Sequence, residues 1–432
     1  MRKAALHNLG CKVNSYETEA MKELLQAAGY EIVDFEDKAD VYVINTCSVT
    51  NVADKKSRQM LHRARTRNPQ AVVVAAGCYV QAAGEKLKED GSVDLIVGNN
   101  KKTELVSLLE EYFAGREHPD GVIDISAVQE YEPLHITAQT EHTRAFIKVQ
   151  DGCNQFCSYC IIPYTRGRIR SRRMEDVEEE VRGLAKKGYQ EVVLTGIHLS
   201  SYGLDFKDGT DLLALIRRIH QVDGIKRIRF GSLEPRIITD EFAKALSELP
   251  KVCPHFHLSL QSGCDDVLKR MNRHYDTAFY RDLVARIRTK FDNPSITTDI
   301  MVGFPGETEE EFAESLAFAK EIGFGKVHVF AYSIRPGTRA AKMPNQLTNH
   351  QKEQRSHKMA EVTEQSRQEF LQSQVGKIES VLFETQQADG MQHGYTKNYT
   401  PVCVKSDREL CGEIHDVRIT GVQGDLCTAE LV

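Results

Sequence analysis

The chain reads Asp151-Gly152-Cys153-Asn154-Gln155-Phe156-Cys157-Ser158-Tyr159-Cys160 in its central part. Three thiolates in one short loop, spaced Cys-x3-Cys-x2-Cys, can bind three irons of a four-iron, four-sulfur cluster. The fourth iron then has no protein ligand, and an open coordination position makes a metal site reactive. With 11 cysteines among 432 residues, random placement would give only about 0.007 such triplets. The loop therefore predicts an iron–sulfur site.

A structural zinc site is the alternative for this loop. Zinc needs a fourth Cys or His close by, and the nearest histidines, His142 and His198, are badly spaced for that purpose. A zinc-containing nucleic-acid-binding protein stays open as a second class of protein. Analysis of iron and sulfide would separate the two.

Length and composition describe a globular protein of two or three domains, because 432 residues exceed one ordinary domain. The formal net charge of −6 does not by itself indicate nucleic-acid binding. The start lacks the apolar core of a signal peptide, and no run approaches the roughly 18 apolar residues of a membrane span. The odd number of scattered cysteines argues against a secreted disulfide framework. We therefore expect a cytoplasmic protein that does not engage a membrane.

The first 115 residues alternate between apolar stretches and helix-like runs, which predicts a parallel sheet covered by helices. The expected strands are Lys3–Leu9, Val41–Asn45, Ala71–Gly77 and Leu95–Val97. Cys11, Cys47 and Cys78 each follow one of these strands. The carboxyl ends of parallel strands share one edge of the sheet, where ligands bind, so the three thiols should converge. Three small buried core residues are the alternative interpretation.

A second alternating series predicts six βα units, that is, a partial parallel barrel. Its expected strands are Ala145–Gln150, Glu191–Thr195, Arg227–Phe230, His255–Leu260, Ser295–Met301 and Lys326–Phe330. The cysteine loop follows the first of these strands, at the rim where such barrels carry their sites. Residues 346–374 have a helical composition, and Gly376–Val432 reads as short strands of a small β-barrel. The predicted divisions are 1–115, a linker at 116–142, a barrel at 143–370 and a β-barrel at 371–432.

At the cysteine loop the chain resembles the radical S-adenosylmethionine (SAM) enzymes, which prefer an aromatic residue such as Tyr159 before the third cysteine. The resemblance implies that Cys153, Cys157 and Cys160 hold a four-iron cluster. Its open iron would bind SAM, and one electron from an external donor would release a 5′-deoxyadenosyl radical. The residues alone indicate only a three-thiolate loop.

The two cysteine trios followed by a small β domain resemble the methylthiotransferases over nearly the whole chain. In that family Cys11, Cys47 and Cys78 would hold a second, auxiliary four-iron cluster that carries the sulfur, and the C-terminal module would be an RNA-binding TRAM domain. Three segments resemble the branch that acts on N6-threonylcarbamoyladenosine beside the tRNA anticodon: Leu9–Asn14, Asn45–Asn51 and Tyr395–Tyr399. The segment Ser232–Pro235 points the same way. The isopentenyladenosine branch and a branch that modifies a ribosomal aspartate remain alternatives, as does a non-enzymatic iron–sulfur electron carrier.

Further candidates lie at strand ends of the barrel and in basic runs. The predicted SAM contacts are Tyr159, Gly196, Ser232, Glu234 and Gln261, and ordinary rim structure is their alternative. Guanidinium and ammonium groups suit phosphate, although a charge run is usually a solvated helix face. The predicted tRNA contacts are Arg166, Arg168, Arg170, Arg172, Arg173, Lys55, Lys56, Arg58, Tyr395 and Lys397. The last two would give stacking and charge to a module with nine acidic and five basic residues in Gly376–Val432.

Overall fold

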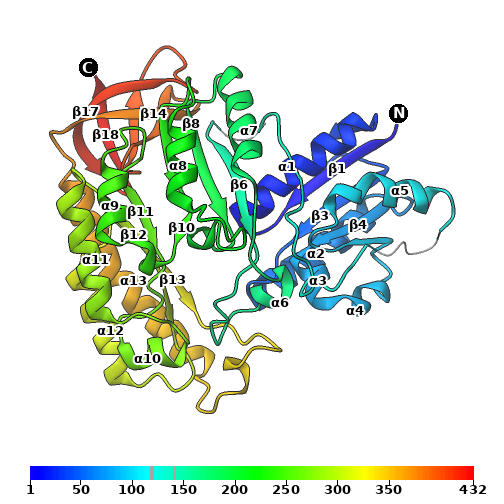
Figure 1. The fold of residues 1–432 in the computed structure, drawn as a ribbon, viewed down its shortest axis with the longest axis horizontal. Coiled ribbons are helices and arrows are strands. Elements are labelled where there is room, and N and C mark those ends of the chain that lie inside the picture. The colour runs from blue at the N-terminus through cyan, green and yellow to red at the C-terminus, as the bar shows by residue number, and fades with distance from the viewer. Residues whose placement is uncertain (117–120, 140–142) are drawn as a thin grey trace.

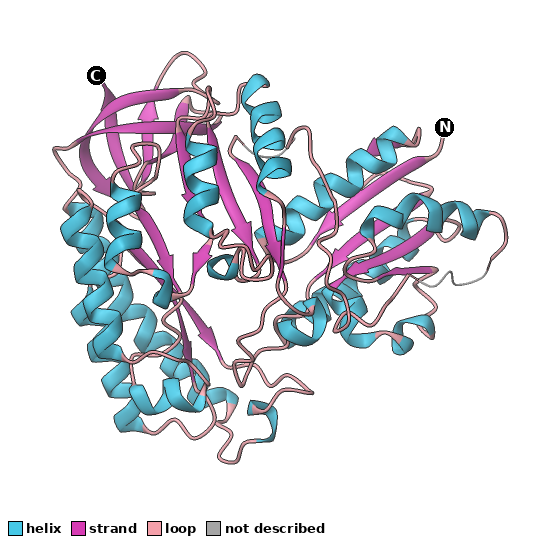
Figure 2. Cartoon of the chain, viewed as in Figure 1, coloured by secondary structure: helices cyan, strands magenta, loops and turns pink. Residues whose placement is uncertain are grey.

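The computed structural model describes residues 1–116, 121–139 and 143–432. Residues 117–120 and 140–142 of the predicted linker lie outside this range. The strands form a parallel sheet near the N-terminus, a larger central array and a small barrel at the C-terminus (Figures 1 and 2). No helix in the described chain combines the length and apolar character that crossing a membrane requires.

The N-terminal sheet has the strand order β2-β1-β3-β4-β5, and all its neighbouring strands are parallel. Its strands are β1 (Lys3–Asn8), β2 (Glu31–Val33), β3 (Val41–Thr46), β4 (Val72–Gly77) and β5 (Leu95–Val97). Its helices are α1 (Lys12–Ala27), α2 (Asn51–Arg67), α3 (Cys78–Ala83), α4 (Glu85–Lys88) and α5 (Leu105–Phe113). One apolar cluster joins α1 and α5 to the sheet, and a second cluster joins α2, α3 and α4 to the sheet. The predicted doubly wound fold is confirmed, although the edge strand β2 was not expected.

The strand sequences explain this arrangement. Every residue of β3 and β4 is buried, as expected for strands covered by helices on both faces. The topological switch lies between β1 and β3. From β1 the chain crosses to β2 on one side, and from β2 it crosses to β3 on the other side of β1. Ligands bind outside such a switch point in open α/β sheets. Cys11 and Cys47 flank it.

The central array contains the six predicted parallel strands in two hydrogen-bonded sheets. They are β6 (Ala145–Asp151), β8 (Glu191–Gly196), β9 (Arg227–Phe230), β11 (His255–Leu258), β12 (Ser295–Val302) and β13 (Lys326–Ala331), with short β7 (Arg170–Ser171) and β10 (Ser232–Leu233) beside them. The outer helices are α7 (Met174–Lys186), α8 (Leu212–His220), α9 (Asp240–Ser247), α11 (Thr277–Lys290) and α12 (Glu309–Ile322), and α13 (Asn349–Gln372) packs on β13. Two short helices, α6 (Ile162–Arg166) and α10 (Asp265–Arg270), lie at the rim. Within the described chain β6 and β13 are not paired, which confirms a partial barrel.

The C-terminal strands close into a five-stranded barrel in the order β14-β15-β16-β18-β17. They are β14 (Ile378–Gln386), β15 (Met391–Thr396), β16 (Pro401–Lys405), β17 (Ile414–Gln423) and β18 (Leu426–Leu431). Strand β15 was not expected, because its sequence Met-Gln-His-Gly-Tyr-Thr carries few residues of high β-propensity. Tyr395 therefore lies on a strand, and only Lys397 and Tyr399 lie in the turn that follows.

Candidate iron–sulfur centres and their surroundings

The first cysteine trio lies at one edge of the N-terminal sheet. Cys11 caps the start of α1 after β1, Cys47 follows β3, and Cys78 begins α3 after β4. Cys47 and Cys78 are buried, whereas Cys11 is exposed. Burial, together with the neighbouring Cys78 and Cys11 thiols, raises the pKa of Cys47 to about 12. The sheet thus brings together three thiols that are far apart in sequence.

Two glycines make this convergence possible. Gly10 has φ +108°, and a Cβ built there would lie 2.9 Å from Cys47 Sγ. Gly77 has φ +91°, and its Cβ would lie 2.5 Å from Asn45 Oδ1. A side chain at either position would push against the thiol-bearing loops, so glycine is needed for conformation and for space.

The second trio occupies the loop after β6. The loop is closed by two backbone hydrogen bonds, Cys153 N to Gly167 O at 3.0 Å and Cys160 N to Cys157 O at 3.0 Å. Burial raises the pKa of Cys153 to about 11 and that of Cys160 to about 12. Arg273 Nη1 donates to Cys157 Sγ at 3.4 Å. The loop is therefore held in shape by its own backbone and by Arg273.

The donor sets fit iron–sulfur clusters better than single ions. In the described parts of the chain, no three His, Cys, Asp or Glu side chains are grouped as ligands of one metal ion. Thiolates that bind three corners of an iron–sulfur cube are further apart than the ligands of one ion, so this result leaves the cluster interpretation intact. Both trios consist only of sulfur, the ligand that such clusters use, and each has a guanidinium directed at a sulfur, from Arg166 and Arg273.

The predicted SAM contacts lie near this loop. A Cβ at Gly196 would lie 2.9 Å from Gln150 Oε1, so glycine leaves room there. Glu234 is buried and pairs with Arg236 at 2.8 Å, Ser232 is exposed, and Gln261 has φ 71°. The Tyr159 ring packs edge-on against Phe304, with 6.4 Å between the ring centroids. No bound molecule tests these contacts, and they stay predictions.

Sequence reasoning missed two residues beside the loop. The first is Arg273, which lacks any motif spacing. The second is His198, whose Nδ1 lies 2.6 Å from Ser201 Oγ and whose buried Nε2 has no hydrogen-bond partner among the described residues. Burial lowers the pKa of His198 to about 4, so the ring is neutral at pH 7. Only the tertiary structure brings these two residues to the cysteine loop, so the sequence pattern could not identify them.

Three of the predicted tRNA contacts are corrected by the structure. Arg166, Arg170 and Arg172 are all at most 2% exposed. Arg166 pairs with Glu17 at 2.5 Å and Arg172 with Glu180 at 2.9 Å, so neither faces solvent. Arg170 lies within 3.8 Å of Asp151. These arginines organise the interior and do not present a phosphate-binding surface.

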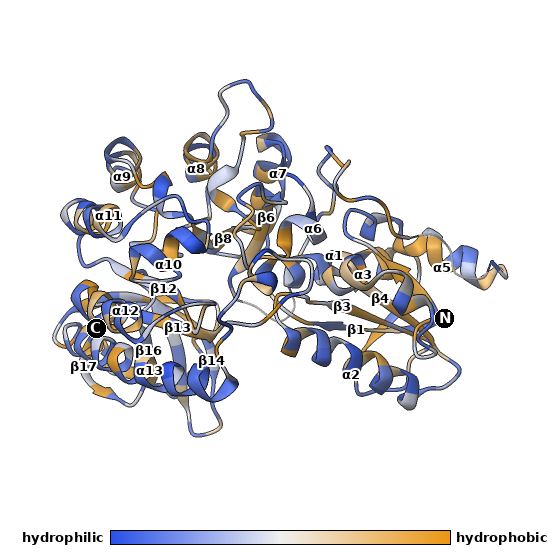
Figure 3. Ribbon diagram, turned by 90° about the horizontal axis from the view of Figure 1, so that it is seen from below, coloured by the Kyte–Doolittle hydropathy of each residue, from blue (hydrophilic) through white to orange (hydrophobic). Residues whose placement is uncertain are grey.

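The other predicted basic contacts are exposed. Arg168 lies 4.9 Å above the Phe156 ring, and Arg168 and Arg173 line a cleft of about 600 Å³ together with the segment 128–135. Acidic Asp176 and Asp205 also line this cleft. Lys55, Lys56 and Arg58 are exposed on α2, a helix whose residues are largely hydrophilic (Figure 3). Five basic side chains thus remain available to a polyanion.

The segment Tyr395–Tyr399 docks the small barrel onto the central one. Tyr395 stacks on Tyr399 at 4.5 Å, and Arg144 lies about 5 Å from both rings. Arg227 and Arg229 of β9 donate to the carbonyl oxygens of Tyr395 and Lys397 at 3.1 and 3.0 Å. Lys397 Nζ donates to Pro250 O. Tyr395 and Lys397 are therefore half-buried against the central barrel, and their contact with tRNA stays a prediction.

Comparison with known proteins agrees with this geometry. Family models match the Radical SAM superfamily at residues 147–319, Uncharacterized protein family UPF0004 at residues 3–98 and the TRAM domain at residues 372–432. Threonylcarbamoyladenosine tRNA methylthiotransferase MtaB of Bacillus subtilis is 42% identical, over 97% of this chain and 94% of its own. tRNA-2-methylthio-N(6)-dimethylallyladenosine synthase of Pelotomaculum thermopropionicum is 35% identical, over 98% and 96%.

The fold also has a solved counterpart. The structure of the radical S-adenosylmethionine methyltransferase TsrM from Kitasatospora setae superposes on 78% of this chain and 74% of its own, with a TM-score of 0.57 and 15% identity. At that identity the likeness concerns the fold alone. The full-length relatives carry the assignment, and with the two thiol trios they show that this chain belongs to the radical SAM methylthiotransferases.

Proposed function

We propose that this protein converts N6-threonylcarbamoyladenosine beside the anticodon of tRNA into its 2-methylthio derivative. The observation that carries the proposal is the pair of thiol trios, each at the carboxyl ends of parallel strands, in a chain 42% identical to a relative of that name. A carbon–hydrogen bond of an aromatic ring gives acids, bases and polar nucleophiles no point of attack. Two reactive metal centres near one substrate, with SAM as cofactor, supply a radical route.

Each trio has a separate role in this proposal. Cys153, Cys157 and Cys160 hold the four-iron cluster that binds SAM, and Tyr159, Gly196, Ser232, Glu234 and Gln261 border that cofactor. Cys11, Cys47 and Cys78 hold the auxiliary cluster, which provides the sulfur. When bound, the two clusters and SAM supply a hydrogen-abstracting radical and a methylated sulfur; the chain fixes the thiols, excludes water from the buried ones and receives electrons from an external donor.

The exposed basic residues bind the tRNA backbone in this proposal. Arg168 and Arg173 follow the second cysteine loop along the chain, and Lys55, Lys56 and Arg58 lie on α2, which begins shortly after Cys47. Replacing Arg168 and Arg173 with Ala should weaken tRNA binding. In a plot of the logarithm of the binding constant against the logarithm of salt concentration, the slope should become shallower by the amount expected for about two phosphate contacts. Arg182→Ala, an exposed arginine paired with Glu178, is the matched control and should leave the slope unchanged. An unchanged slope in the double variant would remove these residues from the interface. A tRNA substrate also supports a cytoplasmic location for the reaction.

Nucleoside analysis tests the reaction. Mass spectrometry of tRNA from cells that lack the protein should show no 2-methylthio-N6-threonylcarbamoyladenosine, and the native gene should restore it. Persistence of this nucleoside with loss of the 2-methylthio isopentenyl derivative would favour the other tRNA branch, to which the dimethylallyladenosine relative belongs.

Two triple variants separate the roles of the trios. Replacing Cys11, Cys47 and Cys78 with Ala should halve the iron bound per chain, abolish methylthiolation and leave formation of 5′-deoxyadenosine from SAM and a reductant. Replacing Cys153, Cys157 and Cys160 with Ala should abolish 5′-deoxyadenosine formation. A purely electron-carrying protein would form no 5′-deoxyadenosine even when unsubstituted.

A further inference from the structure

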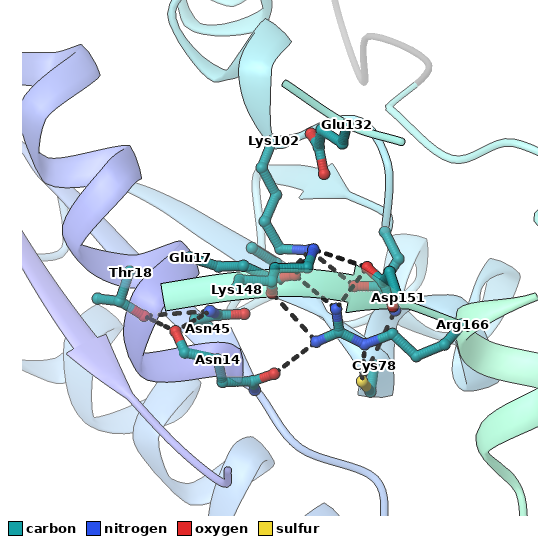
Figure 4. A network of polar contacts seen from close by, with 12 residues as sticks. Asn14, Glu17, Thr18, Asn45, Cys78, Lys102, Glu132, Lys148, Asp151 and Arg166 are labelled. Atoms are coloured by element: carbon teal, nitrogen blue, oxygen red, sulfur yellow. Dashed lines mark hydrogen bonds and ion pairs between the residues drawn. The ribbon is translucent and has the colours of Figure 1, made fainter. Parts of the chain in front are cut away.

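Arg166, at the end of α6, connects the two thiol trios. Its side chain is fully buried and donates in four directions (Figure 4). Nε donates to Cys78 Sγ at 3.2 Å, Nη2 donates to Asn14 Oδ1 at 2.6 Å, and both Nη atoms bond the Glu17 carboxylate at 2.5 and 3.1 Å. Nη1 also reaches Asp151 Oδ2 at 3.2 Å. One guanidinium therefore contacts a thiol of the first trio and the strand end that leads into the second.

The two connected segments are themselves anchored at the same point. Asn14 and Glu17 lie on the first two turns of α1, directly after Cys11, and the Cys11 thiol faces Asn14 Oδ1 at 3.9 Å. Asp151 is the last residue of β6 and lies two positions before Cys153. Arg166 thus fixes the start of α1, the start of α3 and the end of β6 relative to one another. A shift of any of these would move one cluster site against the other.

The surroundings of Arg166 are densely charged. Among the described residues of this network, four cations and three carboxylates are almost fully buried: Lys102, Lys148, Arg166, Arg170, Glu17, Asp151 and Glu132. A buried charge without a counter-charge is costly. Glu17 and Asp151 pair with Arg166 at 2.5 and 3.2 Å, so these buried carboxylates hold its guanidinium in place against Cys78 Sγ.

We propose that Arg166 is a positioning residue of the auxiliary site: it holds Cys78 against α1 and β6, and its hydrogen bond withdraws charge from the sulfur. This rests on the assignment of Cys78 as a cluster ligand in the proposed function. Hydrogen bonds to cluster sulfurs raise the reduction potential. A lysine would supply the charge without the fork of donors that reaches Cys78, Asn14 and Glu17 together.

The test uses the full-length chain with Cys153, Cys157 and Cys160 replaced by Ala, so that only the auxiliary cluster binds. In that background we compare Arg166, Arg166→Lys and Arg166→Gln by iron and sulfide analysis and by a dithionite titration followed by electron paramagnetic resonance. Lys102→Met is the matched control, because Lys102 is equally buried and bonds Glu17 at 3.2 Å but, among the described residues, donates to no thiol.

The expected result is a lower potential in both Arg166 variants. At a fixed potential the ratio of reduced to oxidised cluster should fall at least tenfold, which is about 59 mV for a one-electron couple. Lys102→Met removes a buried charge but no hydrogen bond to sulfur, so it should shift the potential by less. If Arg166→Gln folds by circular dichroism but loses its iron while Lys102→Met keeps it, the positioning role is also supported. Equal potentials, or equal iron loss in Arg166→Gln and Lys102→Met, would overturn the inference. Half the expected iron in the unsubstituted chain would instead count against the proposed function.

Discussion

Glu17 is the residue whose removal tests the buried network most directly. Its carboxylate is fully buried and contacts Arg166 at 2.5 Å, Lys148 at 2.7 Å and Lys102 at 3.2 Å. Burial alone would raise the pKa of Glu17, but these three cations hold it well below its usual range. At an effective dielectric constant of about 20, each contact is worth roughly 5–7 kcal/mol before desolvation. Glu17→Gln keeps the shape, removes the charge and replaces one of the two acceptor oxygens with a donor amide group.

Breaking one buried ion pair costs about 3–5 kcal/mol, and we expect the upper end because three cations lose a shared partner. The assay is native-state hydrogen exchange of the metal-free protein, read on peptides of α1 and β6, since a chain of this size does not unfold in one step. A loss of about 4 kcal/mol accelerates exchange by about three powers of ten.

The matched control is Glu104→Gln. Glu104 is exposed and pairs with Lys101 at 2.6 Å, a surface contact worth less than about 1 kcal/mol. If Glu17→Gln accelerated exchange no more than Glu104→Gln, the electrostatic account of the network would be refuted.

Burial lowers the pKa of His198 in the folded protein to about 4 from 6.5, so as pH falls the unfolded chain binds this proton at a higher pH than the folded protein. The contribution of neutral His198 to the free energy of unfolding is therefore fully present above pH 6.5. Up to about 3 kcal/mol of it is lost as pH falls toward 4. Denaturant midpoints of His198→Gln should lack this part of the pH dependence, and identical curves would contradict it. Gly152→Ala should lower the free energy of unfolding, measured by thermal unfolding, by about 3 kcal/mol or more, because the Cβ would lie 1.8 Å from Arg168 O at φ +72°. The control Gly183→Ala lies in open space on α7 and should raise it by about 0.5–1 kcal/mol. Equal shifts in the two variants would disprove the steric argument. Arg335→Ala removes the ion pair to Asp54 at 2.7 Å and should make the start of α2 exchange its amide hydrogens faster. Arg339→Ala, a change at an exposed residue, is the control and should not. Unchanged protection of α2 in Arg335→Ala would show that this contact does not hold the helix.

Strand positions were largely predictable, because buried parallel strands are continuous apolar runs. The six barrel strands and four of the five N-terminal strands lie where the sequence pattern indicates. The missed strands, β2, β7, β10 and β15, are short or polar, and tertiary pairing rather than propensity forms them. The convergence of Cys11, Cys47 and Cys78 followed from topology, since strand ends share an edge.

The arginine run could not be interpreted from sequence. Arg166 and Arg172 look like solvated positive residues, but their partners Glu17 and Glu180 lie on separate helices, one of them 149 positions away. The same limit applies to Tyr395, whose stacking partners include Arg144 from the far side of an interface. Charge on a loop indicates a partner, and only the fold shows whether that partner is internal.

The two trios differ in how far apart their members lie along the chain. Cys153, Cys157 and Cys160 stay within one short loop even when the protein loosens, whereas Cys11, Cys47 and Cys78 depend on three strand ends remaining side by side. Iron affinity at a site assembled by folding is coupled to the stability of that fold. We therefore expect moderate heat stress to empty the site of Cys11, Cys47 and Cys78 first. Under the proposed function the enzyme would then still consume SAM but deliver no sulfur to its substrate.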